Sequence, residues 1–258
     1  MKYGICLIAT AALRMHPDHK SEMVSQLLFG ETFFIHESIT NWHHVECNHD
    51  HYRGWIAKNQ AKTIDEGSFE NLEQSTKYFA GDRLGNIQDA VNKTAFLISG
   101  GSTLIFSHDK MIIGDNELTY TGNIIKPENA SVQDVPVFAR KFLHTPYLWG
   151  GRSSFGLDCS GFAQVVFRMA GLSLPRDASI QANHGEPVHL LEESAPGDLV
   201  FFDDTEEMIN HVGILLGEGL VIHAHGIVRI DKIDHHGIFN TETGKYSHPL
   251  RLIKRIHK

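Results

Sequence analysis

Cys159 stands between Asp158 and Ser160 and opens an apolar stretch that ends at Gly171. Four apolar residues follow it at helical spacing: Phe162, Val165, Val166 and Met169. This periodicity predicts an amphipathic helix with the thiol in its first turn and a glycine at its end. Because backbone N–H groups at a helix start lack partners and the helix dipole is positive there, we expect a lowered thiol pKa. The stretch is compatible with a nucleophile, but a single cysteine at a helix start is more often a buried residue, so both alternatives stay open at this point.

Two histidines downstream have the spacing to activate such a thiol. His211 opens the stretch HVGILLG, and His223 lies within VIHAHG, after a Gly-Glu-Gly turn. In an antiparallel hairpin these two positions come side by side. One imidazole would then act as the base while the other orients it. Since the chain holds 18 histidines, the alternative is that both are ordinary surface residues.

The composition bounds the class of protein. The chain has 258 residues, of which 41% are hydrophobic, and this is enough for more than one core. Its net charge of -8 argues against nucleic acid or an anionic membrane as a partner. No stretch of about eighteen apolar residues is present, so we expect no membrane-spanning segment.

The cysteines and the N-terminus bear on the cellular compartment. Cys6 and Cys47 either form a disulfide or remain buried thiols, as expected in a reducing cytosol, and Cys159 is left free in both cases. The stretch YGICLIAT predicts a strand rather than a secretion signal, with three side chains in a core: Ile5, Leu7 and Ile8. We therefore expect a cytoplasmic protein, or a periplasmic or exported one if a signal segment was removed.

The elements that must position these residues divide the chain into three parts. Residues 1–65 hold short strands with close turns and predict a small β-barrel. Residues 66–130 predict a second small β-barrel with Gly100-Gly101 and Gly114-Asp115 turns, preceded by a less regular stretch over 69–86. Residues 131–258 predict a helix that stops before Pro146, the helix at Cys159, and three or four antiparallel strands. The chain is thus expected to be α+β.

Two resemblances refine this division. Residues 13–60 resemble a bacterial SH3-like domain through the Leu-Arg-x-x-Pro start, the Gly-Glu and Asn-Trp pairs and the closing Gly-Trp-Ile. Residues 131–255 resemble the NlpC-type cell-wall cysteine peptidases, which have a papain-like α+β fold, through PYLWGG, LDCSGF, LPRDASIQ, APGDLVFF, HVGILLG and VIHAHG. Together they resemble the subgroup of γ-D-glutamyl-L-diamino acid endopeptidases similar to dipeptidyl-peptidase VI.

The resemblance implies a role for each residue of the site. Cys159 would be the nucleophile, His211 the base and His223 the residue that orients His211. The hydroxyl of Tyr147 would stabilise the oxyanion beside the Cys159 backbone N–H. No metal and no cofactor are implied, and we expect the chain to be a monomer.

The resemblance also implies a substrate, a murein peptide with a free N-terminal L-alanine that is cleaved before its diamino acid during cell-wall recycling. The free ammonium needs an acidic or acceptor partner in a closed subsite. Six residues are candidates for substrate contacts: Asp158, Ser160, Asp177, Tyr52, Glu22 and Trp149. Helix and loop capping is the alternative for Asp158 and Asp177, and barrel packing is the alternative for Tyr52.

Three other interpretations are weaker. An exported hydrolase would use the SH3-like domains to bind the cell wall. A metal site would draw on His43, His44, Cys47, His49 and His51, or on the HAHG histidines together with His211, but neither spacing matches a strong zinc signature. A catalytically inactive binding module is disfavoured because the three expected catalytic positions hold competent residues.

Overall fold

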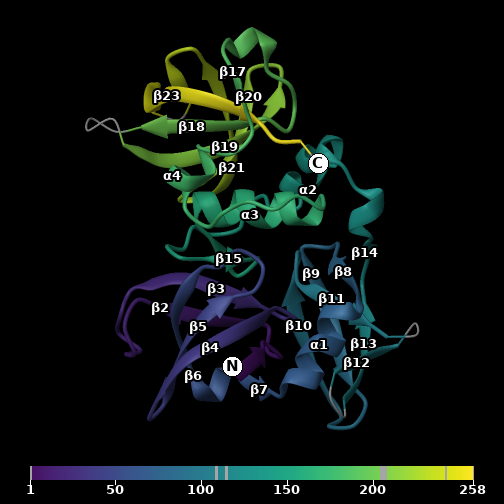
Figure 1. Cartoon of the computed structure of the whole chain (residues 1–258). Helices are drawn as coiled ribbons and strands as arrows, with labels where there is room; N and C mark the ends of the chain where they lie inside the picture. The colour runs from purple at the N-terminus through teal and green to yellow at the C-terminus, as the bar shows by residue number, and fades with distance from the viewer. Residues whose placement is uncertain (1, 108–109, 114–115, 204–207, 242, 258) are drawn as a thin grey trace. The chain divides into compact units, whose positions relative to one another are not determined.

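The computed structural model describes residues 2–107, 110–113, 116–203, 208–241 and 243–257 (Figure 1). The chain forms two compact units. The first comprises Met1–Asn129 and the short segment Trp149–Ser154, and the second comprises Ala130–Leu148 and Phe155–Lys258. Among these residues, no helix has the length and apolar character needed to cross a membrane.

The first unit begins with an antiparallel sheet of seven strands in the order β3-β2-β6-β5-β4-β1-β7. The strands are β1 Lys2–Ile5, β2 Thr10–Arg14, β3 Met23–Leu28, β4 Thr32–Ile39, β5 Trp42–Cys47, β6 Arg53–Ala57 and β7 Lys62–Ile64, with a 3₁₀ turn η1 Lys58–Gln60. Cys6 and Cys47 lie in the core of this sheet and are not joined by a disulfide. Ile5 is buried as expected, but the prediction for Ile8 was wrong: it is 38% exposed, because β1 ends at Ile5 and Ile8 lies in the following bend.

The rest of the first unit contains one helix and two smaller antiparallel sheets, ordered β10-β9-β13-β12 and β11-β8-β14. The elements are α1 Glu66–Gln74, β8 Thr76–Ala80, β9 Leu84–Asp89, β10 Thr94–Ser99, β11 Thr103–Phe106, β12 Met111–Ile113, β13 Asn116–Thr121, β14 Ile124–Ile125 and η2 Pro127–Asn129. Ile5 of β1 and Phe29 of the turn after β3 pack into the core of this region. A domain boundary at residue 65 stays a prediction.

Two sequence-based predictions in this region have clear outcomes. The stretch expected to be less regular holds the end of α1 and strands β8 and β9. That expectation overlooked Asp65, whose carboxylate accepts a hydrogen bond from the Ser68 backbone N–H and caps the helix. The predicted turn at Gly114-Asp115 lies outside the described residues, whereas Gly101 forms its turn with a positive φ of 81°.

The segment Trp149–Ser154 packs against β3 of the first unit. Gly150 has a φ of +76°, and a Cβ at this position would lie 2.1 Å from the Met23 carbonyl oxygen, so glycine is required there. The Arg152 backbone N–H donates to Gln26 Oε1 at 2.8 Å, and its guanidinium donates to both carboxylate oxygens of Glu31, at 3.0 and 3.1 Å. Close backbone approach and a buried ion pair therefore fix this short segment.

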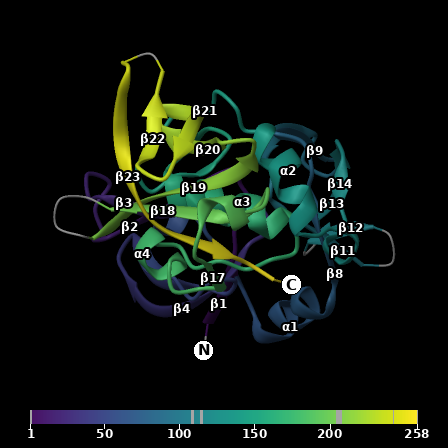
Figure 2. The same ribbon diagram turned by 90° about the horizontal axis from the view of Figure 1, so that it is seen from above.

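The second unit is built around an antiparallel sheet in the order β17-β23-β18-β19-β20-β21-β22, in which β22 also pairs with β23. The strands are β17 Glu186–Val188, β18 Leu199–Asp203, β19 Ile209–Gly217, β20 Leu220–His225, β21 Ile227–Asp234, β22 Gly237–Asn240 and β23 Lys245–Arg255. Figure 2 shows the long strand β23 running from β22 to β18. Six strands thus close into a barrel, and the α+β prediction is confirmed.

The helices of this unit include one whose first residue is Cys159. The elements are η3 Val132–Asp134, α2 Val135–Arg140, β16 Gly156–Leu157, α3 Cys159–Met169, α4 Ala178–Gln181 and η4 Leu191–Glu193. Strand β15 Arg152–Ser153 belongs to the first unit. Helix α3 packs against β19 and β20 (Figure 1). It ends at Met169, and the predicted stop Gly171 follows directly after the cap residue, with a φ of 75°. Helix α2 stops at Arg140, earlier than expected, because residues 141–144 form turns.

Candidate active site

Cys159 is the first residue of α3 and lies against the start of β19. Its Sγ donates a weak hydrogen bond to the Asn210 carbonyl oxygen at 3.9 Å, and the backbone N–H groups of Val212 and Ser160 hydrogen-bond to the sulfur. The side chain is largely buried, with 7% of the residue exposed. The sulfur thus contacts the backbone on both sides of His211.

The ionisation state expected for this thiol was wrong. Burial raises the pKa of Cys159 to about 11, and the negative charge of Asp158 adds to this rise. The backbone N–H groups of Val212, in β19, and of Ser160, at the helix start, lower the pKa, but they do not outweigh the loss of hydration. The resting residue is therefore a thiol, and its proton must be removed during the reaction.

A row of hydrogen bonds leads from His211 to a buried carboxylate. His211 Nε2 lies 2.8 Å from His223 Nδ1, and His223 Nε2 lies 3.0 Å from Asp231 Oδ2. Burial lowers the pKa of both imidazoles, so the pair is neutral at physiological pH. Asp231 then accepts the proton on His223 Nε2, and His223 Nδ1 accepts the proton on His211 Nε2. This tautomer leaves His211 Nδ1 as the basic nitrogen.

Strand register explains why these three side chains meet. Gly213 pairs with His223 across β19 and β20, and His223 pairs with Arg229 across β20 and β21. His211 and Asp231 each lie two residues from one of these pairs, on the same face and within reach of His223. Sequence analysis missed Asp231. The alternation of VRIDKI, which sends Arg229 and Asp231 to the same face, was the available signal.

Arg229 completes the row at its far end. It donates to both oxygens of the Asp231 carboxylate, from Nε at 2.7 Å and from a terminal nitrogen at 3.0 Å. Hydrogen bonds from His223 and Arg229 lower the pKa of Asp231 against the opposing effect of burial, so it stays ionised. Asp231 is only 5% exposed, so His223 faces a buried carboxylate that stays negatively charged and is held in place by Arg229.

A cavity of about 700 Å³ opens beside His211. Its walls come from the ends of four strands and from the segment that holds Tyr147, and the lining residues are Tyr147, Asp203, Asn210, His211, Ala224, His225, Gly226, Ser247, His248 and Pro249. Tyr147 is held by its backbone N–H, which donates to the Gly226 carbonyl oxygen at 2.9 Å. Burial and the nearby Cys159 raise the Tyr147 pKa to about 12, so its hydroxyl keeps its proton.

Three predicted substrate residues of the second unit lie around the starts of α3 and α4. Asp158 caps α3 by accepting from the Gly161 backbone N–H at 2.7 Å, and Arg176 donates to both of its carboxylate oxygens. Arg176 also donates to Ser160 Oγ at 2.8 Å. Asp177 is the N-cap residue of α4. Its backbone carbonyl accepts hydrogen bonds from the Ile180 and Gln181 N–H groups, but its carboxylate does not cap the helix. Sequence analysis missed Arg176, which is almost fully buried.

The other predicted substrate residues belong to the first unit. Trp149 Nε1 donates to Glu22 Oε1 at 2.6 Å, so these two candidates are brought together. Tyr52 lies at the end of the turn after β5, where its backbone N–H donates to Asp50 Oδ1 at 3.1 Å and its carbonyl accepts from Cys47. Their contacts with substrate stay predictions.

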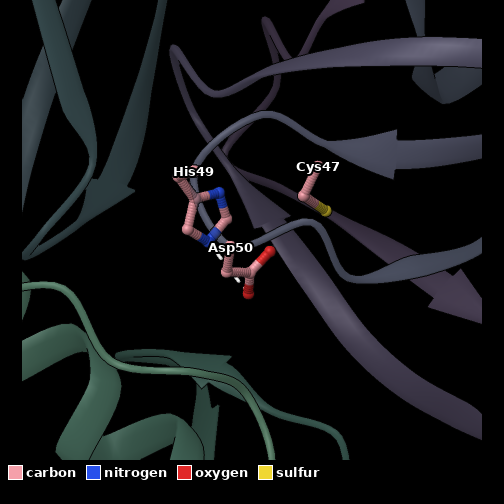
Figure 3. Close-up of side chains that lie close together, drawn as sticks. All are labelled: Cys47, His49 and Asp50. Carbon is pink, nitrogen blue, oxygen red and sulfur yellow. Dashed lines mark ion pairs between the residues drawn. The ribbon is translucent and has the colours of Figure 1, made fainter.

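The histidine cluster near Cys47 does not gather as a metal site of five ligands. Cys47, His49 and Asp50 do lie close together, and His49 forms an ion pair with Asp50 at 3.3 Å (Figure 3). However, the other histidines have separate contacts: His43 with Ser38, His44 with Trp55, and His51 with Glu46. Against the opposing effect of burial, the neighbouring His49 lowers the pKa of Asp50, and the charge of the buried Arg152 adds to this. This fixed cation disfavours a metal ion beside it.

Matches to known families cover both units. Residues 144–245 match the NlpC/P60 family, and residues 13–60 match the bacterial dipeptidyl-peptidase Sh3 domain. Both resemblances found in the sequence are therefore confirmed. The second unit contains an NlpC/P60 cysteine peptidase domain. Cys159, at the start of α3, lies within this domain, and so do His211 and His223, in the hairpin of β19 and β20.

Individual relatives agree with these matches. The gamma-D-glutamyl-L-lysine dipeptidyl-peptidase of Bacillus subtilis (strain 168) is 40% identical over 102 residues, which cover 39% of this chain and 34% of that protein. Dipeptidyl-peptidase 6 of Lysinibacillus sphaericus is 25% identical over 243 residues, covering 86% of this chain and 87% of that protein. The fold is similar to an NlpC/P60 family protein from Bacillus cereus ATCC 10987, with a TM-score of 0.84, 19% identity, and 99% and 100% of the two chains covered.

Proposed function

We propose that this chain, which carries an NlpC/P60 cysteine peptidase domain and a bacterial SH3 domain, hydrolyses the bond between γ-D-glutamate and a diamino acid in short cell-wall peptides. The observation that carries this proposal is the row His211, His223 and Asp231, which starts at the strand contacted by the Cys159 sulfur and borders a cavity. The name of the Bacillus subtilis relative supports the γ-D-glutamyl bond, and the names of both relatives support the release of a dipeptide.

The reaction starts from a neutral thiol and a neutral imidazole. His211 Nδ1 takes the Cys159 proton as the sulfur attacks the amide carbonyl, so charge develops only when substrate is present. His223 accepts a hydrogen bond from the resulting imidazolium, and the Asp231 carboxylate stabilises the positive charge through His223. His211 then returns the proton to the leaving amine, and water hydrolyses the thioester.

The oxyanion would be stabilised by two donors. The Tyr147 hydroxyl keeps its proton across the physiological range because its pKa is raised to about 12. The Cys159 backbone N–H, at the start of α3, is the second donor. Removing one such donor costs about 100- to 1000-fold in rate. Tyr147→Phe tests this assignment.

The free L-alanine terminus of the substrate would lie near the start of α3. Asp158, Ser160 and Asp177 remain the candidates in this unit, and Gln181 links α4 to α3 by donating to the Ser160 carbonyl oxygen at 3.0 Å. Because Arg176 already neutralises Asp158, the ammonium would have to share that carboxylate or use another acceptor. Acetylation removes the charge and adds bulk, so it should block this subsite.

The test compares L-Ala-γ-D-Glu-L-Lys with its N-acetylated form. We expect cleavage of the free peptide to L-Ala-D-Glu and lysine, and a kcat/KM at least about 100-fold lower for the acetylated peptide. Cys159→Ala provides the control for contaminating peptidases. Equal turnover of both peptides would refute a subsite that requires a free terminus, and no turnover of either would refute the proposed bond specificity.

We also propose that the protein acts in the cytoplasm, on peptides released during cell-wall recycling. Cys6 and Cys47 support this, because both are fully buried in one core and are not joined by a disulfide, as a reducing compartment favours. Fractionation of cells that express the native gene tests it. Recovery of the enzyme in the medium or on the wall would favour the exported hydrolase instead.

A further inference from the structure

The residues that line the cavity beside His211 indicate which side of the scissile bond it lies on. Its walls include Tyr147 and the His211 ring, but not Asp158, Ser160 or Asp177, which surround the starts of α3 and α4. During hydrolysis His211 protonates the leaving amine, so the leaving group must lie beside its ring. On the proposed function, on which this inference rests, the cavity therefore lies on the diamino-acid side of the bond.

The cavity wall carries one carboxylate, at the end of β18. Asp203 follows Phe202, which pairs with His211 across β18 and β19, and the register shifts between Phe202 and Asp203. The Asp203 side chain is only 13% exposed. A carboxylate in such a partly closed site is favourable when it has a cationic partner. Among the lining residues the structure describes, Asp203 is the only acidic one.

The neighbouring groups leave this negative charge largely in place. Burial lowers the pKa of His248 to about 4, and the pKa of His211 is lowered as well, so neither ring supplies a positive charge at neutral pH. Arg251 does supply one, but its Nε lies 3.6 Å from Asp203 Oδ2 and its side chain is half exposed. A carboxylate has two oxygens, so Oδ1 can serve a second cation.

We propose that this cavity binds the leaving diamino acid and that Asp203 accepts a hydrogen bond from its ω-ammonium group. A cavity of about 700 Å³ is within the usual range for small-molecule sites, so it has room for an amino acid. Lysine and diaminopimelate share the ω-ammonium, and both are therefore expected to bind. Asp203 is thus a residue that selects for a diamino acid over an uncharged one of the same length.

The test uses tripeptides that end in lysine, diaminopimelate or norleucine, the last of which has the length of lysine without the ammonium. The unaltered protein should cleave the first two with a kcat/KM at least about ten-fold above that for norleucine. Asp203→Asn should reduce this preference to within about two-fold, because an amide carries no charge to attract the ω-ammonium group. Asp234→Asn, which changes an exposed carboxylate of β21 outside the cavity lining, is the matched control.

Product inhibition gives a second measurement that needs no variant. Free lysine should inhibit the unaltered protein at least about ten-fold more strongly than free norleucine. Equal cleavage of all three peptides, equal inhibition by both amino acids, or a folded Asp203→Asn protein that keeps the lysine preference would overturn the role of Asp203. Cleavage of none of the peptides would instead overturn the proposed function, and this inference with it.

Discussion

Each unit of the molecule holds a buried cluster of an arginine, carboxylates and histidine, and the two clusters differ at one end. In the first unit, Arg152, Glu31, Asp50 and His49 form what we call the closed cluster, in which Arg152 is 0% exposed and holds both oxygens of Glu31. In the second unit, Arg229, Asp231, His223 and His211 form the open cluster. Its last member lines a cavity.

The two clusters share a buried carboxylate with a lowered pKa but differ in access to a cavity, and this access distinguishes the candidate reactive site. Both clusters lower the pKa of a buried carboxylate, Asp50 in one and Asp231 in the other, so a lowered pKa alone does not distinguish them. In the closed cluster the charges satisfy one another and hold the segment Trp149–Ser154 on β3. In the open cluster they fix the tautomer of a histidine that substrate can reach. Five experiments can break or sharpen this contrast.

The largest effect is expected at the nucleophile. Cys159→Ala should lower kcat by at least about 10⁴-fold, because no other group can form the thioester. The variant should melt within a few degrees of the unaltered protein, as the change removes one small, mostly buried atom. Activity near that of the unaltered protein would remove Cys159 from the reaction.

At the buried end of the open cluster, Asp231→Asn should lower kcat by about 10- to 100-fold, since an amide cannot stabilise the imidazolium through His223. A merely structural role would leave the pH profile unchanged. We expect its acid limb to move to lower pH, because the lost negative charge disfavours protonation of the histidine pair. Asp231→Glu should recover part of the activity, and Asp234→Asn is the control.

In the closed cluster the effect should fall on stability. Arg152→Met leaves the Glu31 carboxylate buried without its cation, and we expect a loss of about 3–5 kcal/mol in the free energy of unfolding. The matched control is Arg53→Met, which breaks an exposed ion pair with Glu46 and should cost less than about 1 kcal/mol. Urea unfolding measures both. Equal losses of unfolding free energy in the two variants would show that the buried ion pair of the closed cluster stabilises the protein no more than an exposed one.

The pH dependence of kcat follows from the neutral histidines of the open cluster. His211 must be unprotonated to act as base, and its pKa lies well below the ordinary value of 6.5. Activity should therefore rise with pH through that lowered pKa and be constant across neutral pH. The raised pKa of Cys159 should set no limb there, because its proton leaves during attack. A limb near pH 6.5 or above would contradict a buried, neutral His211.

The smallest effect is expected from metal removal. Cys47, His49 and Asp50 lie close enough to suggest a site (Figure 3). However, the buried Arg152 already supplies a positive charge beside them. Dialysis against a chelator should change neither the melting temperature nor kcat, and Cys47→Ser should not alter metal content. Stoichiometric zinc in the purified protein, lost in Cys47→Ser, would show that the closed cluster binds a metal.

Local patterns in the sequence predicted much of the second unit. The period of the apolar residues and Gly171 placed α3 correctly, and the Gly-Glu-Gly turn placed His211 and His223 on one hairpin. Asp231 was out of reach, because its contact with His223 depends on the register of a second hairpin. The pKa of Cys159 was misjudged because the sequence shows the helix start but not the strand that covers the sulfur.

The first unit was harder to predict, since its cores combine distant segments. Phe29 packs with residues some seventy positions later, such as Ile98 and Leu104, and no local period indicates this. Helix α1 was missed because Leu72 is its only buried residue, so the helix lacks a continuous apolar stripe. Its contacts, such as the stacking of Phe69 on Tyr3, come from a distant strand that no local pattern indicates.

The segment Trp149–Ser154 also limits how this gene could have been assembled. Because six residues encoded inside the peptidase region belong to the first unit, a cut near position 130 does not separate two self-sufficient modules. A peptidase region transplanted onto a foreign partner would carry Arg152 without Glu31, and Gly150 without the Met23 carbonyl that it approaches. Recombination at this point is therefore expected to succeed only when both pieces are exchanged together, so the two regions should be inherited as one block.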